Sequence, residues 1–330
     1  MPNQFKIAYF FIILALGTLL SSCSTLSYYG QSMSGHLQLL RSREDVHSVL
    51  QSIDTPDELK HRLKSISRIR DFASHTLGLP DNSSYRSYAD IGRKFVVWNV
   101  FATPALSFEP KTSCFLIVGC LSYRGYFKKD DAVKYMESLK DNGFDIYLGG
   151  VMAYSTLGWF DDPILNGMLE RNDFDLARLI FHELAHQQLY IKDDTEFNEA
   201  FADAVALIGL GYWLEINSTI EQKRNYEHQL ARENQFIDLV LSYRDKLDLL
   251  YRTDISLTKK HLQKEEIYED LQNAYVQLRS SWGEHSEYDS WFAQGVSNAK
   301  LSAISTYRKL VPFFLQAYRT TGENMEAFYT

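Results

Sequence analysis

Two histidines spaced four residues apart, inside a stretch of helical periodicity, constrain this chain more than any other feature. Apolar residues recur at helical spacing over residues 173–190, and Asp173 is a suitable N-cap. His182 and His186 then lie one turn apart on one face, so both imidazoles can bind one zinc ion. Glu183 lies about 100° further around the helix, where it can act as a general base toward water. The sequence therefore predicts a zinc site on a helix.

The next helical stretch supplies a third ligand. It begins at residue 196 and places Glu199 and Asp203 one turn apart on the same face. Glu199 can complete a set of two histidines and one glutamate, which leaves the fourth zinc position open to water. Asp203 can accept the free N–H of a ligating histidine and fix its tautomer. We therefore expect one zinc ion per chain, bound by His182, His186 and Glu199.

The N-terminus indicates the compartment. Lys6 precedes an apolar run over residues 7–20, which is shorter than the roughly 20 residues of a bilayer-spanning helix. The run ends in Leu-Ser-Ser-Cys23, which resembles the lipobox of bacterial lipoproteins, where cleavage precedes a cysteine that becomes lipidated. By the same resemblance, Ser24 is compatible with sorting to the outer membrane. We expect a lipid-anchored protein on the periplasmic side of a bacterial envelope; a plain membrane anchor and an ordinary signal peptide are the alternatives.

The two remaining cysteines, Cys114 and Cys120, lie in an apolar stretch that predicts a strand over residues 114–122. A straight strand would hold their sulfurs roughly 20 Å apart. A disulfide, which an oxidising envelope permits, therefore needs a bend that Gly119 could provide. Two buried free thiols are the alternative. Neither cysteine is expected to bind zinc, because no closely spaced cysteine pair exists.

Composition excludes several classes of protein. The chain has 330 residues, is 45% hydrophobic and contains only 17 glycines and 7 prolines, which excludes disordered and low-complexity chains. Its 34 basic and 42 acidic residues give a net charge of −8, so we expect no nucleic-acid partner. The shortage of chain breakers favours long helices over a β-sandwich.

Periodicity and turn signals divide the chain into five segments. The predicted fold class is α+β and predominantly α-helical, with a small β-sheet that includes strands over residues 95–101 and 146–148. A long helical hairpin, with arms over residues 217–252 and 257–282, follows in the C-terminal half. The expected segments are a lipoprotein signal peptide (1–22), a lipid-anchored helical segment (23–75), an α+β core with the zinc site (76–216), the helical hairpin (217–285) and a C-terminal helical segment that packs on the core (286–330).

Two motifs carry a resemblance to known families. The HExxH motif at His182 and the Asn-Glu-x-x-x-Asp motif that starts at Asn198 together resemble the gluzincin pattern of thermolysin-like peptidases. The connection from His186 to Glu199 is shorter than in thermolysin, so it must be a tight turn. The chain is also similar, over roughly residues 28–315, to a family of bacterial envelope proteins described as predicted zinc aminopeptidases. The similar stretches are residues 85–90, 97–101, 114–127, 153–163, 288–294 and 298–301.

This resemblance implies a zinc peptidase that acts on a peptide substrate. Glu183 would take a proton from water and deliver it to the leaving amine. A tyrosine or histidine usually stabilises the oxyanion, and Tyr307 and Tyr154 are candidates; each could instead be a packed core residue. In related enzymes an edge strand lies along the cleft and pairs with the substrate. Residues 151–157 would provide it beside the HExxH helix, after a turn at Gly149-Gly150, with a core strand as the alternative.

The family name favours an aminopeptidase, which must hold the α-ammonium of its substrate with a carboxylate. Asp161, Asp162 and Glu196 are the candidates, and solvated surface carboxylates are the alternative for each. A zinc endopeptidase and a cell-wall amide hydrolase are alternative functions. A third alternative is a non-catalytic lipoprotein scaffold with a vestigial zinc site, although an intact Glu183 argues against it.

Overall fold

The computed structural model describes residues 28–115, 118–283 and 285–330. The predicted signal peptide and Cys23 lie outside the described residues. An N-terminal helix spans residues 28–41. The other α-helices are α2 (Val46–Gln51), α3 (Asp57–His75), α4 (Lys129–Lys140), α5 (Asp173–Gln188), α6 (Thr195–Asn217), α7 (Ile220–Tyr251), α8 (Leu257–Ser280), α9 (Asp289–Ala293), α10 (Asn298–Arg308), α11 (Val311–Thr320) and α12 (Met325–Tyr329).

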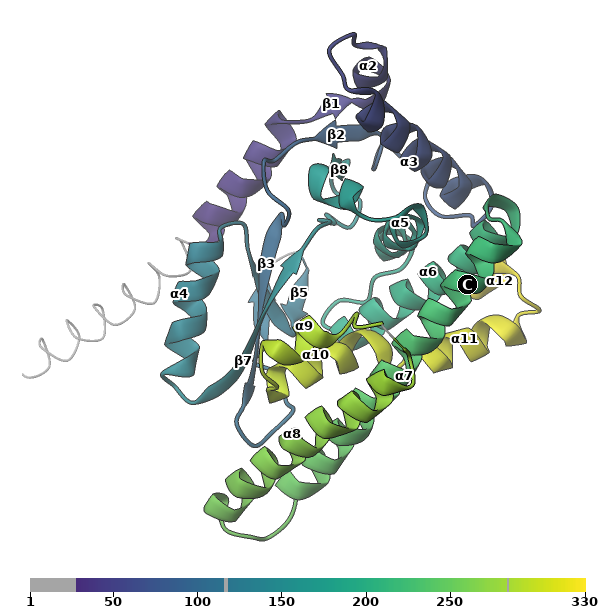
Figure 1. The fold of residues 1–330 in the computed structure, drawn as a ribbon. Helices are drawn as coiled ribbons and strands as arrows, with labels where there is room; N and C mark the ends of the chain where they lie inside the picture. Colours follow the sequence, from purple (N-terminus) through teal and green to yellow (C-terminus); the bar gives the residue numbers. More distant parts are fainter. Residues whose placement is uncertain (1–27, 116–117, 284) are drawn as a thin grey trace, which may run out of the picture.

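The strands form small sheets, so the predicted α+β, predominantly helical class is confirmed (Figure 1). The main sheet has the antiparallel order β6-β3-β7. A second sheet has the order β1-β2-β8, and β4 pairs with β5 alone. The strands are β1 (Glu44–Asp45), β2 (Ser87–Ala89), β3 (Val97–Pro104), β4 (Ser113–Phe115), β5 (Gly119–Leu121), β6 (Tyr123–Tyr126), β7 (Phe144–Val151) and β8 (Ile164–Leu165).

Helices cover both faces of the main sheet. Val100 of β3 packs with Ala132 of α4 on one face, while Phe101, the next residue along the strand, packs with Ala299 of α10 on the other. Successive side chains of a strand point to opposite faces, so these two neighbours serve two different cores. The sheet thereby holds α10, which carries Tyr307, against the helices of the candidate site.

Two strand predictions are wrong. The expected strand over residues 114–122 is instead the antiparallel pair β4 and β5, because Gly119 adopts φ +79° and lets the chain reverse direction. The expected turn at Gly149-Gly150 lies inside β7, where a side chain at Gly150 would collide with the Phe95 ring. Residues 152–157 are not a strand, so the edge strand that reaches the candidate site is β6.

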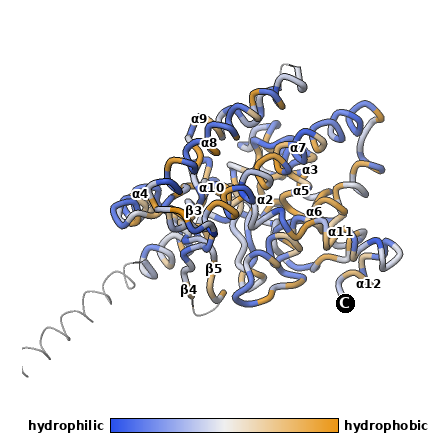
Figure 2. The backbone as a smooth tube through the Cα atoms, turned by 90° about the horizontal axis from the view of Figure 1, so that it is seen from below, coloured by the Kyte–Doolittle hydropathy of each residue, from blue (hydrophilic) through white to orange (hydrophobic). Residues whose placement is uncertain are grey.

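The helical hairpin is confirmed. Helices α7 and α8 lie side by side and extend past the rest of the fold (Figure 1). Ser256 caps α8 by accepting a hydrogen bond from the Lys259 amide, which explains the break between the arms. Figure 2 shows hydrophilic residues along much of α8, as expected for a solvated helix packed on one side only. Among the described helices, none is long and apolar enough to cross a bilayer.

Candidate metal centre

The first two candidate ligands lie on α5, in the middle of the main core. Its N-cap is Asn172, whose side-chain oxygen accepts hydrogen bonds from the amides of Phe174 and Asp175. The predicted cap, Asp173, is instead the first helical residue, where its charge suits the helix dipole. Leu176, Ile180 and other apolar side chains of α5 are fully buried. This packing fixes the helix and turns the face with the two histidines toward α6.

The third candidate ligand, Glu199, lies in the first turns of α6. The tight turn that the sequence requires between His186 and Glu199 is held by Asn198. The Asn198 side chain accepts a hydrogen bond from the Ile191 amide and donates one to the Ile191 carbonyl, both at 2.7 Å. Asp194 caps α6 by accepting from the Phe197 amide. In the Asn-Glu pair of the motif, the Asn198 amide therefore holds the turn and Glu199 is the candidate ligand.

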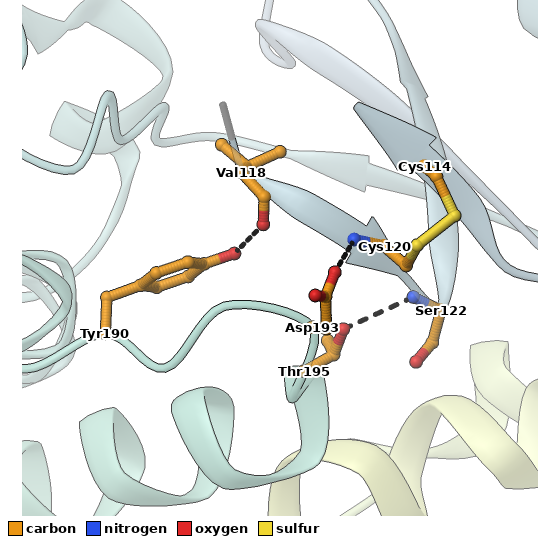
Figure 3. The surroundings of a disulfide bond; sticks show 7 residues. All are labelled: Cys114, Val118, Cys120, Ser122, Tyr190, Asp193 and Thr195. Atoms are coloured by element: carbon orange, nitrogen blue, oxygen red, sulfur yellow. Dashed lines mark hydrogen bonds between the residues drawn. A yellow bond between two sulfur atoms is a disulfide. The ribbon is translucent and has the colours of Figure 1, made fainter. Parts of the chain in front are cut away.

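A disulfide-linked hairpin supports this turn from outside the core. Cys114 and Cys120 are joined by a disulfide across β4 and β5. The Cys120 amide donates to Asp193 at 2.7 Å, and the Tyr190 hydroxyl donates to the Val118 carbonyl at 2.7 Å (Figure 3). The bridged hairpin is thus bonded to the segment that connects the two ligand-bearing helices.

The three donor atoms fit a tetrahedral zinc ion. His182 Nε2 lies 3.1 Å from His186 Nε2 and 3.3 Å from Glu199 Oε2, and the third distance, from His186 Nε2 to Glu199 Oε2, is 3.5 Å. Tetrahedral zinc with ligands at about 2.0–2.1 Å separates neighbouring donors by about 3.3 Å. Among the residues that the structure describes, these three form the group that could hold a metal ion.

The electrostatics of the cluster favour a positive charge at its centre. Burial opposes the charge on His182, but the Asp203 and Glu199 carboxylates prevail and raise the pKa of the imidazole to about 10. Burial likewise opposes the charge on Glu199, yet His186 and His182 lower its pKa to about 2. The buried carboxylates therefore retain their negative charge and stabilise a positive charge between them. A divalent metal ion would supply that charge.

Glu183 is not one of the three candidate donors. It is 8% exposed and lines the same cavity as the ligands. Burial raises the pKa of its carboxyl, and the neighbouring His182 and His186 offset this only in part. A buried carboxylate of raised pKa beside a candidate metal site is suited to accept a proton and to return it.

Asp203 is part of a buried charge network that the sequence analysis did not find. Its Oδ1 lies 3.7 Å from His182 Nδ1, on the side away from the donor nitrogen. The Arg308 guanidinium lies 2.8 Å from Asp203 Oδ2, and Arg178 lies 3.4 Å from Oδ1. Arg178 also pairs with Glu233 of α7 at 2.7 Å. The network therefore links the helical hairpin and α10 to a candidate zinc ligand.

Two tyrosines, Tyr123 and Tyr307, flank the candidate ligands, and the sequence had indicated only Tyr307. Tyr123 of β6 donates a hydrogen bond to Glu199 Oε1 at 3.4 Å. The Tyr307 ring stacks on His182 with ring centroids 6.4 Å apart, and its hydroxyl bonds to no residue that the structure describes. Burial, together with Glu199 and Tyr123, raises the pKa of Tyr307 well above its usual range, so the hydroxyl keeps its proton. Tyr154 lines the same cavity but packs on Phe127.

The ligands and Glu183 open into a cavity of about 540 Å³. Its wall combines aromatic and apolar side chains, among them Tyr28, Tyr123, Leu179 and Tyr190, with polar ones such as Asn99. A cavity of this size and lining suits an organic ligand or a short peptide segment.

The three carboxylates expected to hold an α-ammonium are not among the lining residues. Asp162 is buried against the Thr156 amide, and Glu196 lies 3.6 Å from Lys309. Asp161 is exposed, and its carbonyl accepts from Arg43. Apart from the ligand set and Glu183, the carboxylates of the cavity are Asp175 and Asp203.

Comparison with curated proteins finds no match, and comparison with solved structures finds none either. A family model described as "Putative aminopeptidase" matches residues 27–330. The match includes every residue of the cluster described above, the hairpin and the C-terminal helices. Because it spans most of the chain, the protein belongs to this family of putative aminopeptidases.

Proposed function

We propose that the protein is a zinc-dependent peptidase, and specifically an aminopeptidase. The observation that carries the proposal is the donor set of His182, His186 and Glu199, whose mutual distances of 3.1 to 3.5 Å match tetrahedral zinc. The family description supports peptide hydrolysis. A zinc ion in this site would polarise the scissile carbonyl and make water more acidic.

Glu183 is the proposed general base. Its raised pKa favours uptake of the proton that an attacking water loses, and the same carboxyl then returns that proton to the leaving amine. The proposed donor to the oxyanion is Tyr307, because its hydroxyl is protonated and has no partner in the described protein. Tyr123 instead holds Glu199 in place through its hydrogen bond.

Asp203 is the proposed positioning residue for His182. A carboxylate next to Nδ1 favours the tautomer that carries its proton on Nδ1 and leaves Nε2 free to bind metal. Arg308 and Arg178 keep Asp203 ionised, since burial raises its pKa but the Arg178 charge, the His182 hydrogen bond and the Arg308 charge together lower it.

The proposed location is the periplasmic side of a bacterial envelope, with a lipid anchor on Cys23. The lipobox-like sequence at Cys23 and the apolar run before it support this proposal. The outer membrane is the proposed destination, on the identity of Ser24.

The decisive experiment separates the base from the ligands. The full-length protein should contain about one zinc ion per chain, measured by elemental analysis, and should cleave members of a peptide library. Glu183→Gln should retain the metal and the fold but lose about 10²–10⁴-fold in turnover, because it removes only the proton acceptor. His186→Ala should lose the metal as well.

A surface variant provides the matched control. Glu170→Gln changes a carboxylate of the same type just before α5, which pairs with Lys94 outside the cavity, and should leave turnover and zinc content unchanged. Wild-type protein that binds no zinc even after reconstitution would refute the metal site. Zinc-loaded protein that cleaves cell-wall amides but no peptides would instead identify the amide hydrolase alternative, and cleavage of neither would support a scaffold.

A further inference from the structure

Five exposed large hydrophobic side chains gather on two segments beside the cavity. Tyr29, Met33 and Leu37 recur every fourth residue along the N-terminal helix, with exposed fractions of 40%, 61% and 41%. Trp159 and Phe160 follow in the loop after β7 and are 68% and 50% exposed. We call these five residues the apolar rim. Single exposed hydrophobic residues are ordinary, whereas a gathered set of this kind marks an interaction surface.

Two contacts join the segments that carry the rim. The His36 ring, on the helix that carries Met33 and Leu37, lies 4.6 Å from the Phe160 ring, measured between centroids. Arg43, just after that helix, donates to the Asp161 carbonyl at 2.6 Å. The helix and the loop are therefore packed together, and the exposed apolar side chains of the rim belong to these two adjoining segments.

The rim lies at the cavity that holds the candidate metal centre. Tyr29 belongs both to the rim and to the cavity lining, and its neighbour Tyr28 lines the cavity as well. On the loop, Leu157 lines the cavity two residues before Trp159. Whatever covers the rim therefore lies beside the entrance to the candidate active site.

Three features of the chain identify the occupant as a lipid surface. The rim includes Trp159 and Tyr29, and tryptophan and tyrosine are the residues that favour the boundary between water and lipid. Arg41 lines a shallow groove together with Met33 and Leu37, which suits the phosphate of a lipid headgroup. The chain outside the described residues joins the rim directly, because Tyr28 follows Cys23 by five residues, a reach of at most about 18 Å.

We propose that the apolar rim rests on the membrane surface, so that the cavity opens at the lipid headgroups. The lipid on Cys23, if attached as proposed above, would hold the rim within reach of the bilayer. Substrates would then be peptide segments that lie at, or emerge from, that surface. The docking does not require catalysis, so it can be tested separately from the proposed reaction.

The test measures the surroundings of nitroxide labels on the full-length, zinc-loaded protein bound to vesicles of phosphatidylethanolamine and phosphatidylglycerol. Labels are attached through Met33→Cys and Phe160→Cys, and through Leu262→Cys as the control. Leu262 is 61% exposed, the same as Met33, but lies on α8. Collisions of each label with oxygen, which concentrates in lipid, are compared with collisions with a water-soluble nickel complex.

The rim labels should show a severalfold higher ratio of oxygen to nickel collisions than the label at position 262. Equal ratios at all three positions would overturn the proposal. Protection of the rim labels from both reagents would also overturn it, because protein would then cover the rim. If the labels of two molecules broaden each other's spectra, the covering protein is a second copy of this chain. If they do not, it is residues 1–27. Adding Glu183→Gln should leave all ratios unchanged, which separates docking from catalysis.

A second measurement removes the proposed lipid. In a Cys23→Ala background, Met33→Ser and Phe160→Ser should each weaken co-sedimentation with vesicles by up to about tenfold, since each removes one apolar anchor. Leu262→Ser should have no effect. Unchanged co-sedimentation of the rim variants would refute a role for the rim in membrane contact.

Discussion

The Arg308 guanidinium lies 2.8 Å from Asp203 Oδ2, and Asp203 in turn lies 3.7 Å from the ring nitrogen of His182 that faces away from the donor set. Arg308 closes α10, near the C-terminus, whereas His182 and Asp203 come from α5 and α6. The C-terminal helices are thus connected to the candidate metal centre by two charged contacts. The position of His182, a candidate metal ligand, consequently depends on a residue more than 100 positions away in the chain.

Arg308→Met tests this connection. It removes one of the two guanidinium partners of a buried carboxylate, and breaking a buried pair typically costs about 3–5 kcal/mol of unfolding free energy. Zinc affinity should fall by about 10–100-fold, because the partner that orients His182 is itself released. Competition with a zinc chelator and urea unfolding measure the two effects. Arg319→Met, on the exposed face of α11, is the control. Wild-type zinc affinity in Arg308→Met would show that the network does not orient the ligand.

Tyrosine-to-phenylalanine substitutions should separate two roles. Tyr307→Phe keeps the ring stacked on His182 but removes the hydroxyl, so kcat should fall about 10²–10³-fold with little change in KM. Tyr123→Phe removes the hydrogen bond to Glu199 and should mainly weaken zinc binding. Tyr154→Phe should have little effect on either quantity. Steady-state kinetics at saturating zinc measure the difference. If Tyr123→Phe, rather than Tyr307→Phe, lost kcat at saturating zinc, the two roles would have to be exchanged.

Local spacing made the cluster of candidate ligands predictable from the sequence. His182 and His186 are one helical turn apart, and Glu199 follows after a short connection, so elementary helix geometry places all three. Arg178 and Arg308 could not be found in this way. Their contact with Asp203 depends on how three separate helices pack, and an arginine in a helix carries no signal that distinguishes a buried partner from a solvated one.

The two wrong strand predictions and the missed Tyr123 also depend on structure that local spacing does not encode. The stretch from Cys114 to Ser122 has strand composition throughout, and the sequence indicated a bend at Gly119 only as the condition for a disulfide. Residues 151–157 were assigned as an edge strand by the resemblance to related enzymes, but the chain leaves the sheet after Val151. Tyr123, on the true edge strand, was missed because a tyrosine in a strand is ordinarily a packing residue.

Asp162→Asn should change how stability depends on pH. Burial raises the pKa of the Asp162 carboxyl from its usual 3.8 to about 7, because the Thr156 hydrogen bonds offset the loss of water only in part. The unfolded chain releases this proton at a lower pH than the folded chain does. The contribution of the protonated Asp162 carboxyl to the free energy of unfolding is therefore fully present below about pH 4 and is lost as the pH rises to about 7. The variant should therefore match wild type at pH 4 and exceed its unfolding free energy at pH 8, by at most about 4 kcal/mol.

Urea unfolding at the two pH values measures this effect, and the exposed neighbour Asp161 offers the control Asp161→Asn. A constant difference between Asp162→Asn and wild type across this range would show that Asp162 does not hold a proton in the folded state.

Blocking the α-amine of the substrate should show whether the protein cleaves peptides at their N-terminus or internally. An aminopeptidase binds the α-ammonium of its substrate to a carboxylate, and the described cavity offers Asp175 and Asp203 besides the ligand set and Glu183. Asp203 already pairs with Arg308 and Arg178, whereas the side-chain partner of Asp175 is the neutral amide of Asn172, at 2.7 Å. Asp175 is therefore the expected ammonium acceptor.

Acetylation of the N-terminus should consequently lower kcat/KM by about 10²-fold or more, because it leaves a carboxylate of the site unpaired. Asp175→Asn should cause a similar loss on free peptides and make the enzyme indifferent to acetylation, since position 175 then carries no charge that could bind the α-ammonium. Asp173→Asn provides the control, because Asp173 pairs with Arg62 and does not line the cavity. The measurement compares matched peptides with free and acetylated N-termini, and product masses locate the cut. Internal cleavage of acetylated peptides at the rate of free ones would make the protein an endopeptidase, because no group in the cavity would then read the amine.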